Sequence, residues 1–358
     1  MAYISFKPTD YFNTTLYTGN GSTNTIVTGV DNDMVWLKGN SVTNGEIFDT
    51  VRGATKYLST NSDGSENSAH SDNLTAFGST GFTLGANSAN DINVNLTAYT
   101  SWNWRAGTTT GKTTSGETIT PTAYSINPTS GIGMYAYTGT GANGTIAHGL
   151  SSTPKFIMVK RLNVAGNWMC GGSIVGTGLS YNNLNTIGPK YDNATIWNST
   201  LPSSTVISIG TYGATNTNLS TYMLYAFAPV KGFSKFGNYT GNGNADGTFV
   251  YTGFEPEMII AKNRDSGGPA AYGWTMISNT FGMGGATTAN PAYNELTQNV
   301  FADQLVVAAT GNPVDFLSNG FKWRGTGTGS NQSTAPFTYM AFAKNPFVSS
   351  NSKAGTAR

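Results

Sequence analysis

Charged residues are scarce in this sequence. Only 10% of its 358 residues are Asp, Glu, Lys or Arg, against about 25% in an ordinary globular domain. The formal net charge is +1, whereas nucleic-acid binding requires a clustered excess of Lys and Arg. We therefore expect no nucleic-acid partner.

Cysteine and long apolar runs are also missing. The single cysteine, Cys170, excludes an intramolecular disulfide framework and is expected to be a small buried side chain. No apolar run approaches the ~20 residues of a membrane helix, so no membrane insertion is expected. Residues Met1 to Thr9 lack the charged-then-apolar pattern of a signal peptide, which fits a protein assembled inside a cell and released by lysis.

A helical pattern is absent as well. Thr, Val, Ile, Tyr, Phe and Trp occur in short runs broken by Gly, Asn, Ser and Pro, which is typical of the strands and turns of a sandwich or barrel. The chain is nevertheless 38% hydrophobic and 12% aromatic, so it is not disordered. The sequence predicts an all-β fold with enough apolar material for one core per hundred residues.

One motif recurs three times along the chain. Tyr-Thr-Gly-x-Gly begins at Tyr17, Tyr137 and Tyr239, and its glycines supply the positive φ angles of a turn between strands. A further glycine follows each motif at a similar distance: Gly29, Gly149 and Gly253. Next comes a short apolar run that ends at Lys38, Lys160 or Lys262. Each run predicts a core strand, and each lysine is expected to mark the point where that strand returns to solvent.

Each copy also ends alike, in a strand with large side chains two residues apart. These pairs are Trp102 and Trp104, Tyr225 and Phe227, and Met340 and Phe342. We expect Trp102, Tyr225 and Met340 to occupy similar places along one strand of each copy. We expect Trp36, Phe156 and Met258 to occupy similar places along the neighbouring central strand of each copy.

The spacing predicts three tandem β-sandwich repeats of jelly-roll or lectin-like type. They span residues 1–107, 120–229 and 230–348, with a Gly/Thr-rich linker at 108–119 and a C-terminal tail at 349–358. We expect the three copies to superpose with the same strand order. The junction from Pro229 to Phe236 is short and partly apolar, so the second and third copies should pack closely there.

No catalytic, cofactor-binding or metal-binding residue is predicted. The two histidines, His70 and His148, have no cysteine or carboxylate at ligand spacing, and His148 is expected to be a turn or surface residue. The segment from Gly107 to Thr113 resembles a phosphate loop, but it has three residues between its glycines instead of four. Neither a strand before it nor a helix after it is expected.

Two oxygen-rich segments partly resemble calcium loops. Asn242, Asn244 and Asp246 space like the start of such a loop, but Gly253 stands where the bidentate carboxylate belongs. Asn61, Asp63 and Glu66 form a similarly weak pattern. Four tryptophans can stack on sugar rings or pack in the core, and core packing is the favoured interpretation: Trp168, Trp197, Trp274 and Trp323. No carboxylate pair stands out as a glycosidase dyad.

Longer motifs connect the chain to a known group. They are YFNTTLYTGNG at Tyr11–Gly21, WLK at Trp36–Lys38, FDTVRG at Phe48–Gly53, GFTLG at Gly81–Gly85, WNWRAG at Trp102–Gly107 and the stretch Ser234–Phe254. In these motifs the chain resembles a family of uncharacterised marine-phage proteins, although Gly39–Ser41 departs from the family pattern. The resemblance implies laminin-G-like or lectin-like sandwiches in virion structural or tail-fibre-like proteins.

Together these observations predict a non-enzymatic virion structural protein on the particle surface, most simply a tail-fibre-like appendage involved in host attachment. Capsid decoration, as a cement or head-fibre protein, and a carbohydrate-binding module are the alternatives. The expected partners are other virion proteins, further copies of the chain, and a host surface glycan or receptor; no cofactor is expected. Host recognition is expected from loops such as Asn61–Asn73 and Ser266–Tyr272.

Overall fold

The chain folds as an all-β protein, as the sequence predicts. The computed structural model describes residues 4–39, 43–86, 92–265, 273–280, 295–296, 300–304 and 313–346. Within these ranges the helical elements are two single turns, η1 (Pro8–Asp10) and α1 (Gly213–Asn216), and no helix is long and apolar enough to cross a membrane. We call residues 1–107, 120–229 and 230–348 segments 1, 2 and 3.

Segment 1 forms two antiparallel sheets. The larger has the order β1-β8-β3-β4-β5, with β1 at Phe12–Thr18, β3 at Met34–Gly39, β4 at Gly45–Asp49, β5 at Leu58–Ser59 and β8 at Ala98–Trp104. The smaller has the order β2-β7-β6, with β2 at Asn24–Val27, β6 at Leu74–Gly78 and β7 at Gly81–Leu84. Tyr17 and Phe48 of the larger sheet and Phe82 of the smaller meet in one buried cluster, so the two sheets form a sandwich.

Segment 2 repeats this plan with a wider large sheet. Its order is β15-β14-β13-β12-β17-β10-β9, with β9 at Ala123–Asn127, β10 at Ile132–Thr138, β12 at Phe156–Arg161, β13 at Met169–Gly171, β14 at Ser180–Asn183, β15 at Tyr191–Asp192 and β17 at Thr221–Phe227. The small sheet contains only β11 (Gly144–Ala147) and β16 (Val206–Ile209). A separate buried cluster lies between the two sheets.

Segment 3 again has a large and a small sheet. The large one has the order β18-β26-β20-β21-β23, with β18 at Ser234–Thr240, β20 at Phe254–Asn263, β21 at Thr275–Ser278, β23 at Val300–Phe301 and β26 at Pro336–Pro346. The small one has the order β19-β25-β24-β22, with β19 at Phe249–Tyr251, β22 at Glu295–Leu296, β24 at Val314–Leu317 and β25 at Gly320–Trp323.

The motif tyrosines occupy the same register in all three segments. Tyr17, Tyr137 and Tyr239 lie in β1, β10 and β18 of the large sheets, each opposite an aromatic residue of the last strand of its segment. The ring pairs are stacked at 5.1, 5.1 and 4.9 Å. The glycines that end the three motifs have φ angles of +64°, +72° and +64°, as the turn prediction requires. Superposition of whole segments stays a prediction.

The partner strands show one error of register in the sequence prediction. Trp102, Tyr225 and Met340 do occupy equivalent places, and the residues that face them are Trp36, Met158 and Ile260. Phe156 and Met258 instead lie two residues away along the strand, opposite Phe227 and Phe342. A shift of two residues keeps a side chain on the same face of a strand, so the apolar pattern alone did not reveal the error.

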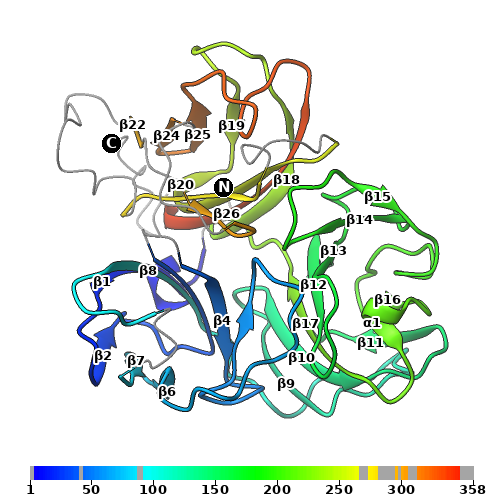
Figure 1. The fold of residues 1–358 in the computed structure, drawn as a ribbon. Helices are drawn as coiled ribbons and strands as arrows, with labels where there is room; N and C mark the ends of the chain where they lie inside the picture. The colour runs from blue at the N-terminus through cyan, green and yellow to red at the C-terminus, as the bar shows by residue number, and fades with distance from the viewer. Residues whose placement is uncertain are drawn as a thin grey trace.

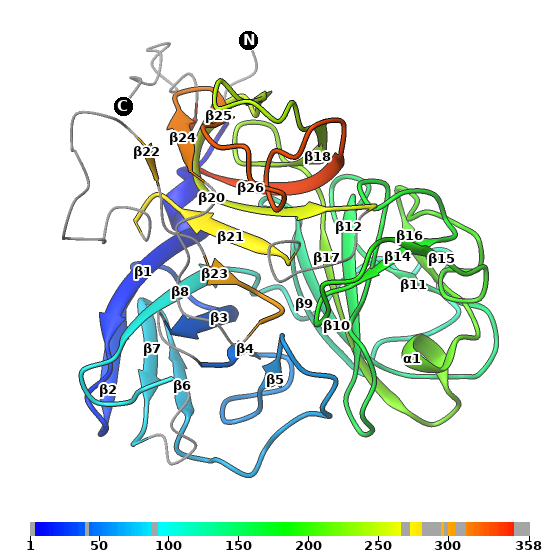
Figure 2. The ribbon, with the colours of Figure 1, turned by 45° about the horizontal axis from the view of Figure 1, so that its top comes forward.

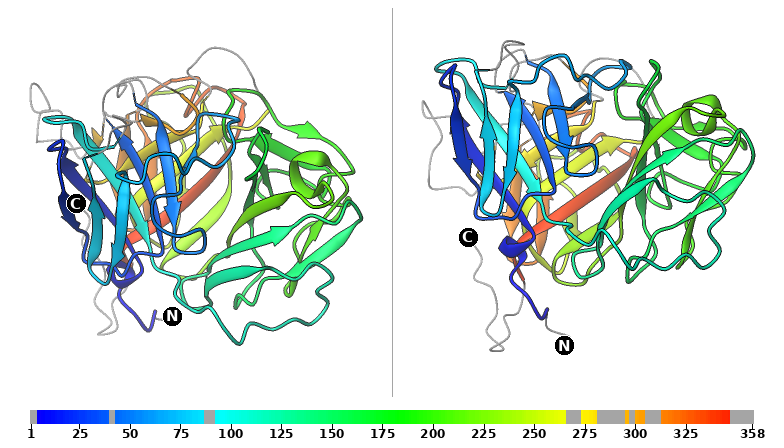
Figure 3. Two further views of the ribbon diagram at one scale, coloured as in Figure 1. Left: turned by 60° about the horizontal axis from the view of Figure 1, so that its bottom comes forward. Right: turned by 90° about the horizontal axis from the view of Figure 1, so that it is seen from below.

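The three large sheets share a single core. One buried cluster contains side chains of all three segments, among them Trp104, Phe227 and Phe342. The three segments accordingly surround a common centre as three lobes (Figures 1 and 2). Strand β26, drawn red in Figure 3, lies between segments 1 and 2, because the Phe342 ring is stacked on Phe12 at 4.9 Å and contacts Phe227 edge-on at 6.1 Å.

This shared core explains the composition of the central strands. The large sheets are covered on their outer faces by the small sheets and on their inner faces by one another. Strands β3, β12 and β20 are therefore buried almost throughout, and strands covered on both faces read as continuous apolar runs. The cavity left at the centre has a volume of only about 10 Å³ and is lined by Trp36, Phe227 and Ile260 among others.

The connections between segments are packed against the sandwiches. In the predicted linker 108–119, Ile119 is buried, and its N–H group and that of Thr118 both donate to the carbonyl of Thr145. In the junction from Pro229 to Phe236, Phe233 and Phe236 enter the shared core, which confirms close packing of segments 2 and 3. The predicted tail 349–358 lies outside the described residues.

Trp36 lies in the shared core and is only 2% exposed. Truncating it should therefore destabilise the protein strongly. We expect Trp36→Ala to lower the free energy of unfolding by roughly 2–5 kcal/mol through lost burial and a new cavity. Val27→Ala is the control, because Val27 is 71% exposed. Denaturant unfolding of both variants tests the prediction, and a Trp36→Ala curve indistinguishable from that of the wild type would contradict it.

Candidate functional site

A buried asparagine closes the motif turn in each segment. Asn93, Asn216 and Asn331 accept a hydrogen bond through Oδ1 from the backbone N–H group that follows the first motif glycine, at 3.0, 2.7 and 3.0 Å. The amide group of each asparagine also donates to carbonyls of the turn and of its own loop. The motif is therefore a structural clamp.

The motif tyrosine completes this clamp. The hydroxyl groups of Tyr17, Tyr137 and Tyr239 donate to the carbonyl of the residue just before the asparagine, at 2.7, 2.6 and 2.6 Å. Sequence reasoning missed these asparagines. A signal was present, because each lies six positions before the aromatic residue that faces the motif tyrosine: Tyr99, Tyr222 and Phe337.

The clamp of segment 3 occupies the oxygen-rich segment that begins at Asn242 and resembles a calcium loop. Asn242 Oδ1 accepts from Asn331 Nδ2 at 2.8 Å and from the N–H group of Asn244 at 3.0 Å. The Asp246 carboxylate is paired with Lys322 Nζ at 2.6 Å. Across the described ranges, no group of three or more His, Cys, Asp or Glu side chains is arranged to hold a metal ion.

The three lysines that end the central strands are buried, which contradicts the prediction that they mark a return to solvent. Lys38 Nζ donates to the carbonyl of Gln304 in segment 3 at 2.8 Å, and Lys160 Nζ donates to that of Asp63 in segment 1 at 2.8 Å. Lys262 Nζ donates to the carbonyl of Asn263 at 2.9 Å. Burial lowers the pKa of all three to about 8. These strands end against another part of the protein, which a pattern within one copy does not reveal.

Polar side chains link the segments in a closed ring. Trp168 Nε1 of segment 2 donates to the carbonyl of Ser59 in segment 1 at 2.9 Å. Trp274 Nε1 of segment 3 donates to the carbonyl of Asn183 in segment 2 at 3.0 Å. Thr60 Oγ1 of segment 1 donates to the carbonyl of Ala302 in segment 3 at 2.7 Å, which closes the ring.

The four tryptophans considered for sugar stacking are all buried, which confirms the core interpretation. Cys170 is buried as well, as expected, and burial raises the pKa of its thiol. His148 lies just after β11 and before Gly149, outside a strand, but its side chain is buried, so the surface alternative was wrong. Its Nδ1 accepts from the N–H group of Leu150 at 3.0 Å, and burial lowers the pKa of the ring.

The segment Gly107–Thr113, which resembles a phosphate loop, forms an internal ion pair. Lys112 Nζ is paired with Glu117 Oε2 at 2.5 Å, and both side chains are buried. No helix follows the segment, as expected, but strand β8 ends shortly before Gly107, contrary to expectation.

The FDTVRG motif forms a buried charged link between segments 1 and 2. Arg52 Nε is 2.6 Å from Asp49 Oδ2, and Tyr225 of segment 2 donates its hydroxyl proton to the same oxygen at 2.6 Å. A carboxylate that is removed from water in this way needs such partners. The motif is thus explained by packing between segments.

A carboxylate pair that sequence reasoning missed lies in β20. Glu255 and Glu257 flank Pro256, where the register with β26 shifts, and both side chains are buried. Glu255 accepts from Asn279 and Asn345, and Glu257 accepts from Thr280 Oγ1 at 2.9 Å. Burial raises the pKa of Glu257 to about 7. Both carboxyl groups are therefore bound by groups of the protein itself.

An open groove lies on the outer side of segment 2. It has a volume of about 440 Å³ and is lined by Gly166, Asn167, Met169, Tyr181, Asn183, Tyr212, Gly213 and Ala214. Its position follows from the fold, because the small sheet of segment 2 has two strands, whereas those of segments 1 and 3 have three and four. Strand β14 is left partly uncovered beside the turn into α1, with Tyr181 and Asn183 partly exposed. We call this cavity the tyrosine groove.

The lining of the tyrosine groove is polar but uncharged. Tyr212 is 37% exposed, and Tyr181 is partly buried with its ring 5.5 Å from that of Tyr191. Burial, helped by the nearby hydroxyl groups of Tyr212 and Tyr191, raises the pKa of Tyr181. Asn183 Oδ1 is buried without a hydrogen-bond partner. Asn167 Oδ1 accepts from Asn185 Nδ2 at 2.9 Å.

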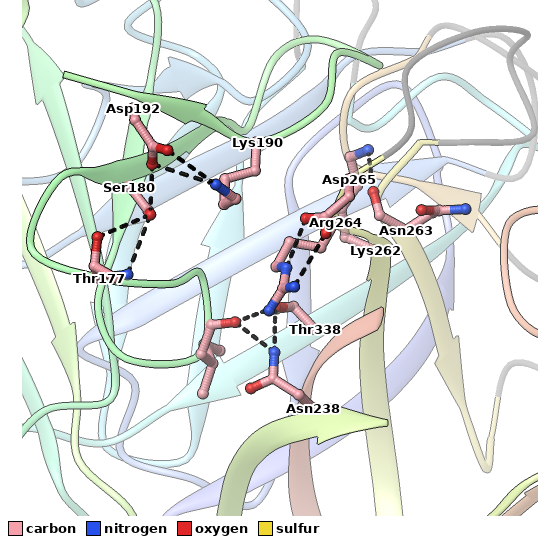
Figure 4. A network of polar contacts seen from close by, with 11 residues as sticks. Thr177, Ser180, Lys190, Asp192, Asn238, Lys262, Asn263, Arg264, Asp265 and Thr338 are labelled. Carbon is pink, nitrogen blue, oxygen red and sulfur yellow. Dashed lines mark hydrogen bonds and ion pairs between the residues drawn. The ribbon is translucent and has the colours of Figure 1, made fainter. Parts of the chain in front are cut away.

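The β14–β15 hairpin beside the groove is fixed to segment 3. Asp192 accepts from Ser180 Oγ at 2.7 Å and pairs with Lys190 at 3.2 Å, while the N–H group of Lys190 donates to the carbonyl of Arg264 at 2.6 Å. Figure 4 shows this network together with Asn238 and Thr338, both of which donate to the carbonyl of Ile174. The wall of the groove is therefore held in place from two segments.

Of the two loops expected to recognise a host, the structure describes one. In Asn61–Asn73, the carbonyl of Asp63 accepts from Lys160 and Glu66 pairs with Arg52 at 3.6 Å, so the first half of this loop is tied to the junction of segments 1 and 2. The loop Ser266–Tyr272 lies outside the described residues.

Comparison with known proteins gives a family but no function. The chain belongs to the family described as "Domain of unknown function (DUF7483)", whose profile matches residues 7–346. No significant match was found among curated proteins or among solved structures.

The raised pKa of Glu257 predicts a pH-dependent stability. Between pH 4.5 and about 7, the folded protein keeps a proton that the unfolded chain releases, so the free energy of unfolding should fall as pH rises. The shift from 4.5 to about 7 corresponds to about 3 kcal/mol for this one group, at about 1.4 kcal/mol per pKa unit. Glu257→Gln should remove this part of the pH dependence. Burial also raises the pKa of Asp303, from 3.8 to about 6, and the part of the pH dependence that Asp303 contributes should remain in the variant.

Urea unfolding at several pH values across this window measures the effect. Asp246→Asn is the control, because this exposed carboxylate has a lowered pKa and should not alter the slope in this window. Equal slopes for the wild type and Glu257→Gln would contradict the prediction.

Proposed function

We propose that this DUF7483 chain is a non-enzymatic structural protein on the surface of a phage particle, where it forms a tail-fibre-like appendage involved in host attachment. The observation that carries the proposal is the shared core, which makes three sandwiches into one block with an open, uncharged groove on its outer side. Loops and grooves on a rigid scaffold are where binding functions usually lie. The motif resemblance to marine-phage virion proteins supplies the setting.

The distribution of charge supports assembly into a larger particle. With a net charge of +1 and 10% charged residues, copies of the chain repel one another weakly. A surface rich in Gly, Ser, Thr and Asn also loses little solvation of charge when it is buried against a neighbour. We therefore expect contacts with other virion proteins and with further copies of the chain.

The buried titratable groups support a role without catalysis. Glu255, Glu257 and Asp303 are bound by hydrogen-bond donors of the protein. A general acid or base has to reach its substrate within hydrogen-bonding distance, and these carboxyl groups are buried away from the tyrosine groove. Capsid decoration is the second candidate for the place of this block on the particle, because compactness and low charge suit it equally well.

The proposal predicts that the protein is a component of purified phage particles. Quantitative mass spectrometry of particles should detect it, with a copy number in the tens or below for an appendage. Several hundred copies per particle would replace the appendage with capsid decoration. A protein found in infected cytoplasm and absent from particles would show the virion assignment to be wrong.

A further inference from the structure

We propose that the tyrosine groove binds a neutral saccharide, which stacks on Tyr181 and Tyr212 and is hydrogen-bonded by Asn167 and Asn183. The inference deepens the proposed attachment function and rests on it for the source of the ligand, a host surface glycan. Binding by the isolated protein can be tested without reference to the particle.

The fold of segment 2 forms the groove and fixes the backbone around it. The small sheet has only two strands, and Tyr181 and Asn183 of β14 stay partly exposed, while Met169 and Ala214 contribute apolar atoms to the lining. The backbone around it is fixed: Lys160 Nζ donates to the carbonyl of Gly166 at 2.6 Å, and Tyr222 donates to the carbonyl of Gly213 at 2.8 Å. The volume of about 440 Å³ falls within the range of roughly 300–1,000 Å³ that is usual for small-ligand sites.

The aromatic residues of the groove suit the apolar face of a sugar ring. Tyrosine offers a large, rigid and amphipathic surface at a low cost in conformational entropy. Tyr212 is 37% exposed, and Tyr191, whose ring is 5.5 Å from that of Tyr181, is 42% exposed. These rings differ in this respect from the tryptophans of the chain considered for sugar stacking, which are all buried in the cores.

The asparagines supply the polar half of the site. Asn183 lines the groove, and its Oδ1 is buried without a hydrogen-bond partner, which is unfavourable for an acceptor. Because this oxygen is shielded from solvent in the unliganded protein, a sugar hydroxyl donates to it once the amide turns toward the groove. Asn167 uses its Oδ1 for Asn185, which leaves its amide protons for a hydroxyl oxygen of the ligand. An amide side chain offers both a donor and an acceptor, as does a hydroxyl group.

The absence of charge in the lining defines the ligand class. None of the eight lining residues is Asp, Glu, Lys or Arg, so a carboxylated, sulfated or phosphorylated sugar would lose its hydration without gaining a counter-charge. The nearby Lys190 and Asp192 pair with each other at 3.2 Å. A neutral glycan is therefore favoured over an acidic one.

The test uses the full-length protein on an array of neutral and acidic glycans, followed by titration of the best neutral oligosaccharide. We expect the wild type to bind neutral glycans and Tyr212→Ala to weaken binding about fivefold or more, which corresponds to about 1 kcal/mol for one stacked ring, since 1.4 kcal/mol is a factor of ten. Asn183→Ala should weaken binding as well. Tyr251→Ala is the matched control, since Tyr251 is 52% exposed on segment 3 and should leave binding unchanged.

Thermal unfolding checks that each variant is folded, and Tyr212→Phe, which keeps the ring, should retain most of the affinity. The inference is overturned if no neutral glycan binds, if acidic glycans bind better, or if a folded Tyr212→Ala binds like the wild type. Its failure is distinguishable from that of the proposed function: a protein that binds no glycan but is present in purified particles refutes the groove assignment alone.

Discussion

The structure depends on the burial of three sheet faces against one another. Each large sheet is apolar on both sides, and its small partner sheet covers only the outer side. A sandwich standing alone would expose its inner face, including Trp36 in segment 1 or Met158 in segment 2. Exposed apolar faces of this size are unfavourable in water. The three segments therefore need one another, and their arrangement as three lobes around a centre follows from this need.

The polar contacts between segments follow from the same packing of the three sheets against one another. Where the central strands end against a neighbour, the ammonium groups of Lys38 and Lys160 reach backbone carbonyls of that neighbour. The indole groups of Trp168 and Trp274 do the same. Buried polar groups are costly without partners, so these bonds favour one relative placement of the segments over others. The same placement holds the β14–β15 hairpin beside the tyrosine groove against segment 3, where the N–H group of Lys190 donates to the carbonyl of Arg264.

Local patterns in the sequence were sufficient to predict the strands and turns, but not how the three segments pack against one another. The all-β class, the glycine turns and the register of the motif tyrosines follow from residue types and spacing, because turns and strand alternation are local properties. The burial of Lys38, Lys160 and Lys262 was missed, since a lysine at the end of an apolar run looks alike whether solvent or another segment follows. The asparagine clamp was visible only as a constant spacing of six residues before an aromatic.

The tyrosine groove is the clearest case of information that sequence alone withholds. Tyr181 and Tyr212 are far apart in the chain, and Asn167 and Asn183 are ordinary members of an Asn-rich sequence. What brings them into one lining is a missing strand in the small sheet of segment 2, together with the placement of α1. No motif encodes an absent strand, so the site could be recognised only once the sheets were assembled.

Differential scanning calorimetry of the intact chain tests the shared core most directly. If the three segments depend on one another, the protein should unfold in a single transition, with a calorimetric enthalpy equal to the van't Hoff enthalpy. Trp36→Ala in segment 1 should then lower the midpoint of that whole transition. Three separable transitions, or a Trp36→Ala variant in which only one part of the heat absorption moves, would contradict the account.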